Sequence, residues 1–218
     1  MEYIFFDENS NIKGINLPKS QVGFEKMCKL CSAAETLFST KGFYETSIID
    51  ISKKARTAVG TFYTYFKNKT AIYNYLVKNY YAIIHRQLAQ KTSHCVTRYE
   101  MEKEGIKEFI RFGQKNPHCY KIIWGSSHVD PEIFEDYYTN FAQGYISSLK
   151  KYQNIYIDVD LSNIVWCLMG VSSFIALKVV FTHKSISEQK LDQLADDIMH
   201  ILTEGIFKHK PKQRKKDP

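Results

Sequence analysis

The sequence predicts an all-α protein of about nine helices, and three observations favour this class. Apolar residues recur at helical spacing in one segment after another. Residues that cap helices stand where these segments begin, as at Asp130-Pro131, Asp160 and Ser187. A sustained strand alternation is missing from the pattern, with residues 3–6 as the one short exception. We therefore expect a three-helix N-terminal unit followed by a larger helical unit.

The N-terminal unit is predicted over residues 19–68, after an irregular extension at 1–18 that is closed by Gly14 and Pro18. A first helix carries apolar residues from Phe24 to Phe38 and ends at Lys41-Gly42, where glycine suits the left-handed cap. Thr46 is expected to cap a short second helix. A third helix spans 58–65, with Phe62 and Phe66 facing inward.

The second unit is predicted over residues 69–208, beginning with a long helix that runs to about residue 90. Five more helices follow, at 98–115, 117–127, 131–153, 160–182 and 187–208. The helix at 160–182 is apolar nearly all round, so it needs cover on two sides. Residues 209–218 are rich in Lys and Arg and are expected to form a disordered tail.

Charge is divided unevenly along the 218 residues, whose net charge is +7. Residues 19–91 hold twelve Lys and Arg against four acidic residues, whereas residues 92–207 hold eleven against fifteen. A merely solvated charged surface predicts no such division. The basic N-terminal half therefore indicates contact with nucleic acid.

Neither a secretory signal nor an uninterrupted membrane span is visible, so we expect a soluble cytoplasmic protein without membrane contact. Five cysteines without an export signal indicate reduced thiols. Cys28 and Cys31 form a CxxC that would suit a redox pair or half a metal site. Both cysteines also fall on apolar positions of a helix, and we interpret them as buried core residues.

Two short helices at 46–55 and 58–65, joined by a tight turn after a longer helix, form the layout of a helix-turn-helix reader of DNA. The segments 30–38, 41–43, 46–55 and 59–69 resemble the N-terminal domain of the TetR-type (tetracycline-repressor-like) regulators. This resemblance covers about a fifth of the chain. It implies a DNA-binding domain followed by a helical domain for effector binding and dimerisation.

The resemblance also implies a set of DNA contacts. Thr46 would cap the second helix and touch a phosphate, and the other expected backbone contacts are Thr61, Tyr63, Tyr65 and Lys69. The base edges would be faced by Ala58, Val59, Gly60 and Thr64. Tyr65 also suits packing alone, Gly60 also suits close backbone approach, and Lys69 also suits a solvated lysine.

Two residues depart from the pattern of the resembled family. Arg56 stands where glycine is usual in the turn, and a positive φ there would cost on the order of 1 kcal/mol. Either the turn is built differently, or Arg56 recovers this cost at a phosphate, which makes it a further candidate DNA contact. Ile49 occupies a position that is often basic, so no contact is assigned to it.

The second unit is rich in aromatic residues, as a pocket for a flat or greasy effector would be. The candidate ligand contacts are Phe109, Phe112, Trp124, Tyr137, Phe141, Trp166 and Phe174, although core packing explains each of them equally well. The acidic balance of this unit would suit a cationic effector. The helices at 160–182 and 187–208 are expected to form the interface of a homodimer.

The sequence thus predicts a ligand-responsive transcriptional regulator, a repressor that a small molecule releases from a palindromic operator in double-stranded DNA. No catalytic residue, cofactor or metal site is assigned. A metal- or thiol-sensing regulator of the same fold is the first alternative. An enzyme is the second: its metal or nucleophilic site would be formed by His85, His94, His118 and His128 with Cys95 and Cys119, but adjacent His-Cys pairs diverge on a helix.

Overall fold

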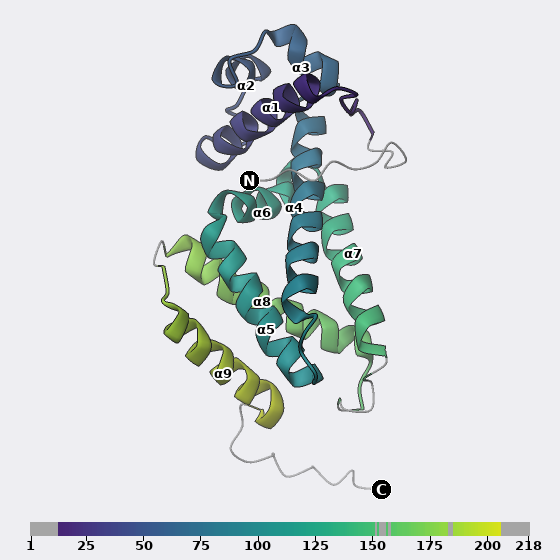
Figure 1. Cartoon of the computed structure of the whole chain (residues 1–218), viewed down its shortest axis with the longest axis vertical. Coiled ribbons are helices and arrows are strands. Elements are labelled where there is room, and N and C mark those ends of the chain that lie inside the picture. The colour runs from purple at the N-terminus through teal and green to yellow at the C-terminus, as the bar shows by residue number, and fades with distance from the viewer. Residues whose placement is uncertain (1–12, 151, 153–155, 157, 183–184, 206–218) are drawn as a thin grey trace, which may run out of the picture.

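The computed structural model describes residues 13–150, 152, 156, 158–182 and 185–205. Within these ranges the chain forms nine helices, as predicted: α1 (Gln21–Thr40), α2 (Ile48–Lys54), α3 (Val59–Tyr65), α4 (Lys69–Thr92), α5 (Arg98–Lys115), α6 (Pro117–Val129), α7 (Pro131–Leu149), α8 (Leu161–Phe181) and α9 (Glu188–Glu204). Figure 1 shows α1–α3 at one end of the molecule and α4 running from them into the other helices. We call residues 13–68 the head and residues 69–205 the body.

Local capping explains where most helices begin. Ser47 accepts from the backbone N–H of Asp50 and the Asp50 carboxylate accepts from that of Ser47, which is a capping box at the start of α2. Thr97 and Glu100 form the same box at α5. Pro117 and Pro131 occupy the first turns of α6 and α7, where a missing N–H costs nothing.

The head is packed around inward-facing side chains of its three helices. Met27 and Leu30 of α1, Ile51 of α2, and Phe62 and Phe66 are all 0% exposed. Phe62 and Phe66 lie with ring centroids 5.6 Å apart, which confirms their predicted inward orientation. The same buried cluster continues along α4 into α6 and α7, so the head and the body share part of one core.

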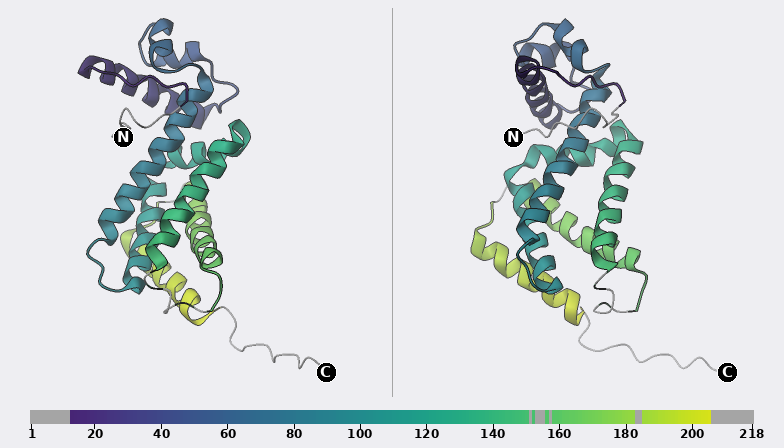
Figure 2. Two further views of the ribbon diagram at one scale, coloured as in Figure 1. Left: turned by 90° about the vertical axis from the view of Figure 1, so that its right-hand side faces the viewer. Right: turned by 45° about the vertical axis from the view of Figure 1, so that its right-hand side comes forward.

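In the body, α4, α5, α7 and α8 surround a common interior, and α6 lies between that interior and the head (Figures 1 and 2). Helix α9 packs on α5 rather than on the side of α7. Their contact is reinforced by ion pairs from Lys103 to Asp196 and from Lys107 to Asp192. Helix α5 is therefore covered by α4, α8 and α9.

Several predictions of extent need correction or fall outside the described ranges. Helix α7 ends at Leu149, earlier than predicted, and α9 ends at Glu204 before Gly205, whose φ of 82° suits only glycine. The predicted tail at 209–218 and the alternation at residues 3–6 lie outside the described residues.

Candidate nucleic-acid interface and effector cavity

The turn between α2 and α3 has the left-handed residue that its layout requires. Arg56 has a φ of 55° and is the one non-glycine residue with positive φ in the described chain. Its N–H donates to Lys53 O over 3.1 Å, and the N–H of Thr57 donates to Ser52 O over 3.0 Å. The turn is thus built in the usual way without glycine, at a cost on the order of 1 kcal/mol.

One face of α3 is open to solvent. Val59 is 39% and Tyr63 53% exposed, and the side chains of Ala58 and Thr64 are exposed beside them. Thr61 is half-buried at the edge of this face. A Cβ built on Gly60 would meet no atom within 4 Å, so packing inside the chain does not require glycine there. These six residues, which we call the reading face, can approach a DNA groove.

Two predicted phosphate contacts are wrong because the side chains are buried. Thr46 is 1% exposed, and its hydroxyl donates to Gly42 O over 2.7 Å. Ser47, not Thr46, caps α2. Tyr65 is 7% exposed and its hydroxyl lies beside Gly23 of α1, so it packs the head. The sequence Ser47-Ile48-Ile49-Asp50 held the signal for the true cap, since an acid three residues after Ser marks a capping box.

Lys69 has partners inside the molecule rather than a solvent-facing ammonium. Its Nζ donates to Phe43 O and Thr46 O, each over 2.7 Å, and lies 4.3 Å from the ring centre of Phe43. Burial lowers the pKa of Lys69 despite the opposing effect of Glu45. The loop between α1 and α2 leaves these carbonyls without helical partners, so Lys69 satisfies them. It fastens this loop to the start of α4.

The segment before α1 holds the end of α3, which the sequence did not indicate. The backbone N–H of Asn16 donates to Tyr65 O over 2.8 Å, and its side-chain amide donates to Thr64 O over 3.2 Å. The N–H of Lys67 donates to Gly14 O over 2.9 Å. The last carbonyls of a helix lack hydrogen-bond donors within it, and Asn16 supplies two such donors to α3. The described part of the N-terminal extension therefore belongs to the head.

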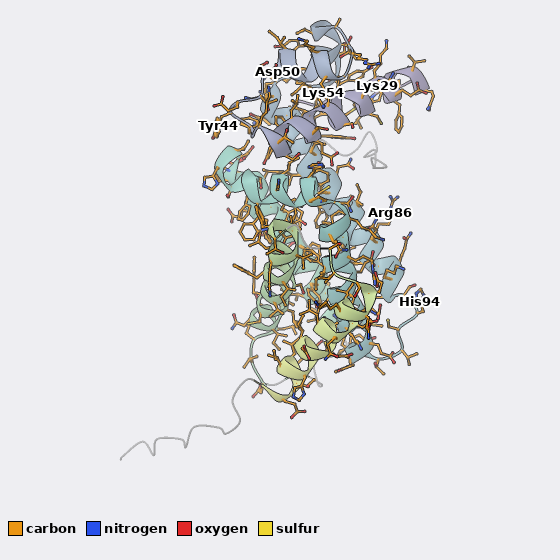
Figure 3. The ribbon with its side chains drawn as sticks, turned by 90° about the vertical axis from the view of Figure 1, so that its left-hand side faces the viewer. Lys29, Tyr44, Asp50, Lys54, Arg86 and His94 are labelled. Atoms are coloured by element: carbon orange, nitrogen blue, oxygen red, sulfur yellow. The ribbon has the colours of Figure 1, made fainter. Side chains whose placement is uncertain are left out.

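Helix α6 and its C-terminal cap Asp130 contact both the head and α4 through polar groups. The Tyr44 hydroxyl donates to His128 O over 2.7 Å, and the Tyr73 hydroxyl donates to Ile122 O over 2.6 Å. Figure 3 places Tyr44 at the junction of the two groups of helices, away from Lys29 and Lys54 on the head. The side-chain amide of Asn74 also donates to the Asp130 carboxylate over 2.7 Å. Helix α6 is thus hydrogen-bonded to the head through Tyr44 and to α4 through Tyr73.

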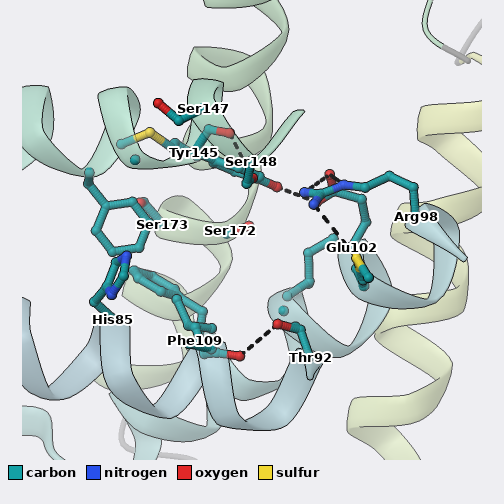
Figure 4. A pocket seen from close by; sticks show the side chains of 18 of the residues that line it. His85, Thr92, Arg98, Glu102, Phe109, Tyr145, Ser147, Ser148, Ser172 and Ser173 are labelled. Atoms are coloured by element: carbon teal, nitrogen blue, oxygen red, sulfur yellow. Dashed lines mark hydrogen bonds and ion pairs between the residues drawn. The ribbon is translucent and has the colours of Figure 1, made fainter. Parts of the chain in front are cut away.

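A cavity of about 690 Å³ lies among α4, α5, α7 and α8. This volume suits a small organic ligand. Figure 4 shows His85 at one side of the cavity and Arg98 with Glu102 at the other. Its wall between these sides includes the apolar and aromatic residues Leu88, Ile106, Phe109, Tyr137, Tyr138, Phe141 and Met169. An apolar interior with polar ends is thus available.

Three of the seven predicted ligand contacts line this cavity, namely Phe109, Tyr137 and Phe141. The other four lie elsewhere. Phe112 is buried in the core shared with the head, and Trp124 packs edge-on against Phe174 at 6.0 Å. Trp166 and Phe174 are 47% and 64% exposed. The helical spacing of aromatic residues does not tell core, cavity and surface positions apart, because all three kinds of position recur along the same helix.

The polar end of the cavity consists of residues that the sequence analysis missed as ligand contacts. Arg98 and Glu102 pair over 2.6 Å with side chains 9% and 7% exposed. The hydroxyls of Tyr145 and Tyr156 donate to the same carboxylate. Burial opposes the charge on Arg98, but the adjacent Glu102 outweighs this, so the pKa of Arg98 is raised. The spacing of Arg98 and Glu102 as an i,i+4 pair was visible in the sequence, but their contact with Tyr145 and Tyr156 was not, because these tyrosines come from distant segments.

The cysteines bear on the sensor alternative. Burial raises the pKa of Cys28, Cys31, Cys95 and Cys119, so these thiols stay protonated at neutral pH. Cys31 is 1% exposed, in agreement with its predicted place in the core. No group of three or more His, Cys, Asp or Glu residues lies together within the described part of the chain. Thiolate sensing is therefore not supported at these four positions.

Helix α8 carries an apolar stripe that the body leaves uncovered. Trp166, Phe174 and Phe181 are 47%, 64% and 52% exposed and recur at helical spacing. By length and composition α8 would also be long enough to cross a membrane, a test that core helices of soluble proteins pass as well. Its opposite face packs on α5 through buried Ala176 and Val180. The stripe is thus an apolar surface on an otherwise packed helix.

Residues 30–76 match the bacterial regulatory proteins of the tetR family. This similarity is thus confined to the N-terminal part of the chain. The match starts within α1 and ends within α4, so it contains the whole of α2, the turn at Arg56 and α3. The resemblance inferred from the sequence is thereby confirmed.

Curated relatives of the chain are HTH-type transcriptional regulators. It is 44% identical over 63 residues to YvdT of Bacillus subtilis strain 168, across 29% of this chain and 31% of that protein. It is 38% identical over 55 residues to HbdR of Aromatoleum sp. strain CIB, across 25% and 24%. A regulator of Haemophilus influenzae aligns over 181 residues, 80% of this chain and 75% of that one, at 23% identity. The chain thus spans about a third or less of the length of YvdT and HbdR.

Solved structures of regulators extend the likeness from the N-terminal segment to the arrangement of helices along most of the chain. The fatty acid degradation regulator FadR of Bacillus halodurans superposes with a TM-score of 0.74 at 14% identity, covering 89% of this chain and 100% of that one. FadR of Bacillus subtilis, solved in complex with stearoyl-CoA, gives a TM-score of 0.66 at 16% identity, covering 83% and 99%. At these identities the likeness concerns the arrangement of helices.

Proposed function

We propose that the protein is a homodimeric transcriptional regulator in the cytoplasm, whose reading face binds operator DNA and whose cavity binds a small molecule that lowers operator affinity. The observation that carries this proposal is the exposed reading face on a helix-turn-helix of the tetR family. Residues 19–68 would bind DNA, and residues 69–208 would bind the effector and form the dimer. Repression is the direction of control that we propose.

The DNA contacts that we retain are those on the surface of the head. Val59, Gly60 and Thr64 would face base edges, since small side chains let a helix enter the major groove. The Tyr63 hydroxyl and the exposed Arg56 would reach phosphates. Ala58 and Thr61 complete this set at the start of α3. The basic charge of residues 19–91 supports the approach of a polyanion.

A second copy of the chain would cover the apolar stripe of α8. Trp166, Phe174 and Phe181 are large and exposed, and Ile201 and Leu202 of α9 are 48% and 37% exposed. Burying such side chains stabilises an interface by about 25 cal/mol per Å² of apolar surface. A two-fold dimer carries two reading faces and so prefers a pseudo-palindrome.

The cavity supports control by an effector, because it borders the elements that position the head. Tyr137 and Phe109 of its wall lie in or against the core that continues into α6, and α6 holds Tyr44 and Tyr73. A ligand changes operator affinity only if it binds the two conformations unequally. The stearoyl-CoA bound to FadR of Bacillus subtilis supports a ligand with a large apolar part.

Selection from a random pool of duplex DNA tests this function. We expect the purified chain to enrich a pseudo-palindrome whose half-sites lie about one helical turn, roughly 34 Å, apart. Sedimentation of the complex should give two chains per site. The control is a variant with Tyr63→Asp, whose added charge repels phosphate and should abolish enrichment without loss of helix content. Enrichment of an isolated half-site, or of no motif, would contradict the proposal.

A further inference from the structure

The formal charges on the described cavity wall are those of Arg98 and Glu102, and they cancel. The two side chains lie at one end of the cavity and are more than nine-tenths buried. The imidazole of His85 lies at the opposite side (Figure 4). A charged ligand therefore finds no net countercharge at the polar end.

The Glu102 carboxylate is already saturated with donors. Oε1 accepts from Arg98 Nε over 2.9 Å, from Arg98 Nη2 over 2.6 Å and from the Tyr156 hydroxyl over 3.1 Å. Oε2 accepts from the Tyr145 hydroxyl. A cationic ligand would have to displace Arg98 to reach this carboxylate. The cationic effector suggested by the acidic balance of the body is thus disfavoured by the geometry.

Arg98 retains donor capacity. Arg98 Nε donates to Glu102 and to the Tyr156 hydroxyl, and Nη2 donates to Glu102, while the contact described for Nη1 is the Met101 sulfur at 3.9 Å, a weak acceptor. An oxygen acceptor of a ligand would satisfy Nη1. A full negative charge there would also face Glu102 across a poorly hydrated site, where repulsion between like charges is strong.

The remainder of the cavity favours hydrocarbon. Phe109, Phe141 and Tyr137 stand edge to face or stacked with one another and with Tyr81, so their rings form a continuous apolar wall. Ile106 and Met169 add aliphatic surface. Burial of an apolar chain against this wall is favourable in proportion to its area.

We propose that the effector is an uncharged amphipathic molecule, with a hydrocarbon body against this wall and a carbonyl or ester oxygen accepting from Arg98. This inference rests on the proposed function of the cavity and names its ligand class. Carboxylates and ammonium compounds with the same hydrocarbon body are the classes that it rejects. The selectivity resides in the Arg98–Glu102 pair.

Three probes with a ten-carbon chain test this: methyl decanoate, decanoate and decyltrimethylammonium. Their affinities are measured by calorimetry on the full chain without DNA. We expect the ester to bind at least about tenfold more tightly than either ion. Tightest binding of decanoate or of the ammonium probe, or binding of none of the three, would overturn the inference. Ester binding without release of DNA would instead count against the proposed control of the operator.

Two substitutions should change the selectivity in opposite directions. Glu102→Gln leaves the Arg98 charge without its partner, so decanoate should become the preferred probe, with a gain of about tenfold or more. Arg98→Gln leaves Glu102 without its partner, so the ammonium probe should gain. General damage to the cavity would weaken all three probes together. Unchanged selectivity in a folded variant would show that the Arg98–Glu102 pair does not determine which probe binds.

A third substitution keeps the test valid if breaking the buried pair impairs folding. Gly105 of α5 lines the cavity, and a Cβ built on it meets no atom within 4 Å. Gly105→Leu should therefore fill the cavity without a clash in the backbone. We expect it to lose ester binding at least about tenfold while its melting temperature is retained. Undiminished ester binding would place the ligand elsewhere and contradict the inference.

Discussion

The head has a filled interior, whereas the body contains a cavity. In the head, side chains from α1–α3 fill the core, and bonds from Asn16 and Lys69 hold the ends of α3 and the loop before α2. In the body, the helices enclose about 690 Å³ beside a buried ion pair. Reading DNA requires a fixed spacing of contacts, whereas sensing a ligand requires room that the ligand fills. The substitutions below test this division.

The largest effect is expected from breaking the proposed dimer. Phe174→Glu places a charge on the apolar stripe of α8, so the variant should be monomeric and lose about 100-fold or more in operator affinity, since one reading face then binds alone. Phe174 is 64% exposed, so the added charge alters the stripe with little effect on the core. Sedimentation and mobility-shift assays measure both properties.

The control for this variant is Val96→Glu, which adds the same charge at an exposed apolar residue outside α8. It should remain dimeric and bind the operator normally. A monomeric Phe174→Glu variant with undiminished affinity for the full operator would disprove the dimer mechanism.

Lys69→Ala tests whether the head is fastened from within. Three carbonyl groups near Lys69 lose their charged donor, so the free energy of unfolding should fall by about 1–3 kcal/mol. The slope of operator affinity against salt should stay unchanged, because no phosphate contact is lost. Denaturant unfolding and a salt titration measure the two effects.

The matched control is Lys67→Ala, an exposed lysine next to the same turn, which should change stability by less than about 0.5 kcal/mol. If instead Lys69→Ala lowered the salt slope by about 0.9, the value for one phosphate, our assignment of Lys69 to an internal role would fail.

Asn16→Ala sharpens the role of the segment before α1. The variant loses the side-chain donor to Thr64 O but keeps the backbone donor to Tyr65 O, so stability should fall by about 0.5–1.5 kcal/mol. Looser positioning of α3 should weaken binding to all sequences alike. A change in sequence preference without a change in stability would argue for direct DNA contact by Asn16 instead.

Two glycines provide the smallest and most direct comparison of the head and the body. Gly60 and Gly105 both lie in helices, and a Cβ on either meets no atom within 4 Å. Either change to Ala should stabilise the chain by up to about 1 kcal/mol through helix propensity. Gly60→Ala should weaken operator binding because DNA approaches there, whereas Gly105→Ala should leave it unchanged. Equal operator affinities for the two variants would remove Gly60 from the reading face.

The sequence by itself determined the helices and the motif of the head. Helical spacing of apolar residues, together with Pro117, Pro131 and the caps at Asp130 and Ser187, is local information, because each helix depends on residues within a few positions of one another. The layout of α2, its turn and α3 was readable for the same reason. The sequence left open whether this turn would place Arg56 at positive φ, and the structure shows that it does.

Only the tertiary structure decided which side chains lie in the core, along the cavity or on the surface. Thr46 and Ser47 are adjacent hydroxyl residues, and packing buried one while the other capped α2. Lys69 turns inward because the loop before α2 brings the carbonyls of Phe43 and Thr46, more than twenty residues away, within hydrogen-bond distance of its ammonium group. The charge balance of the cavity likewise depends on Tyr145 and Tyr156 reaching Glu102 from distant segments. Such contacts depend on how whole helices pack together, and the local spacing of apolar residues carries no information about that packing.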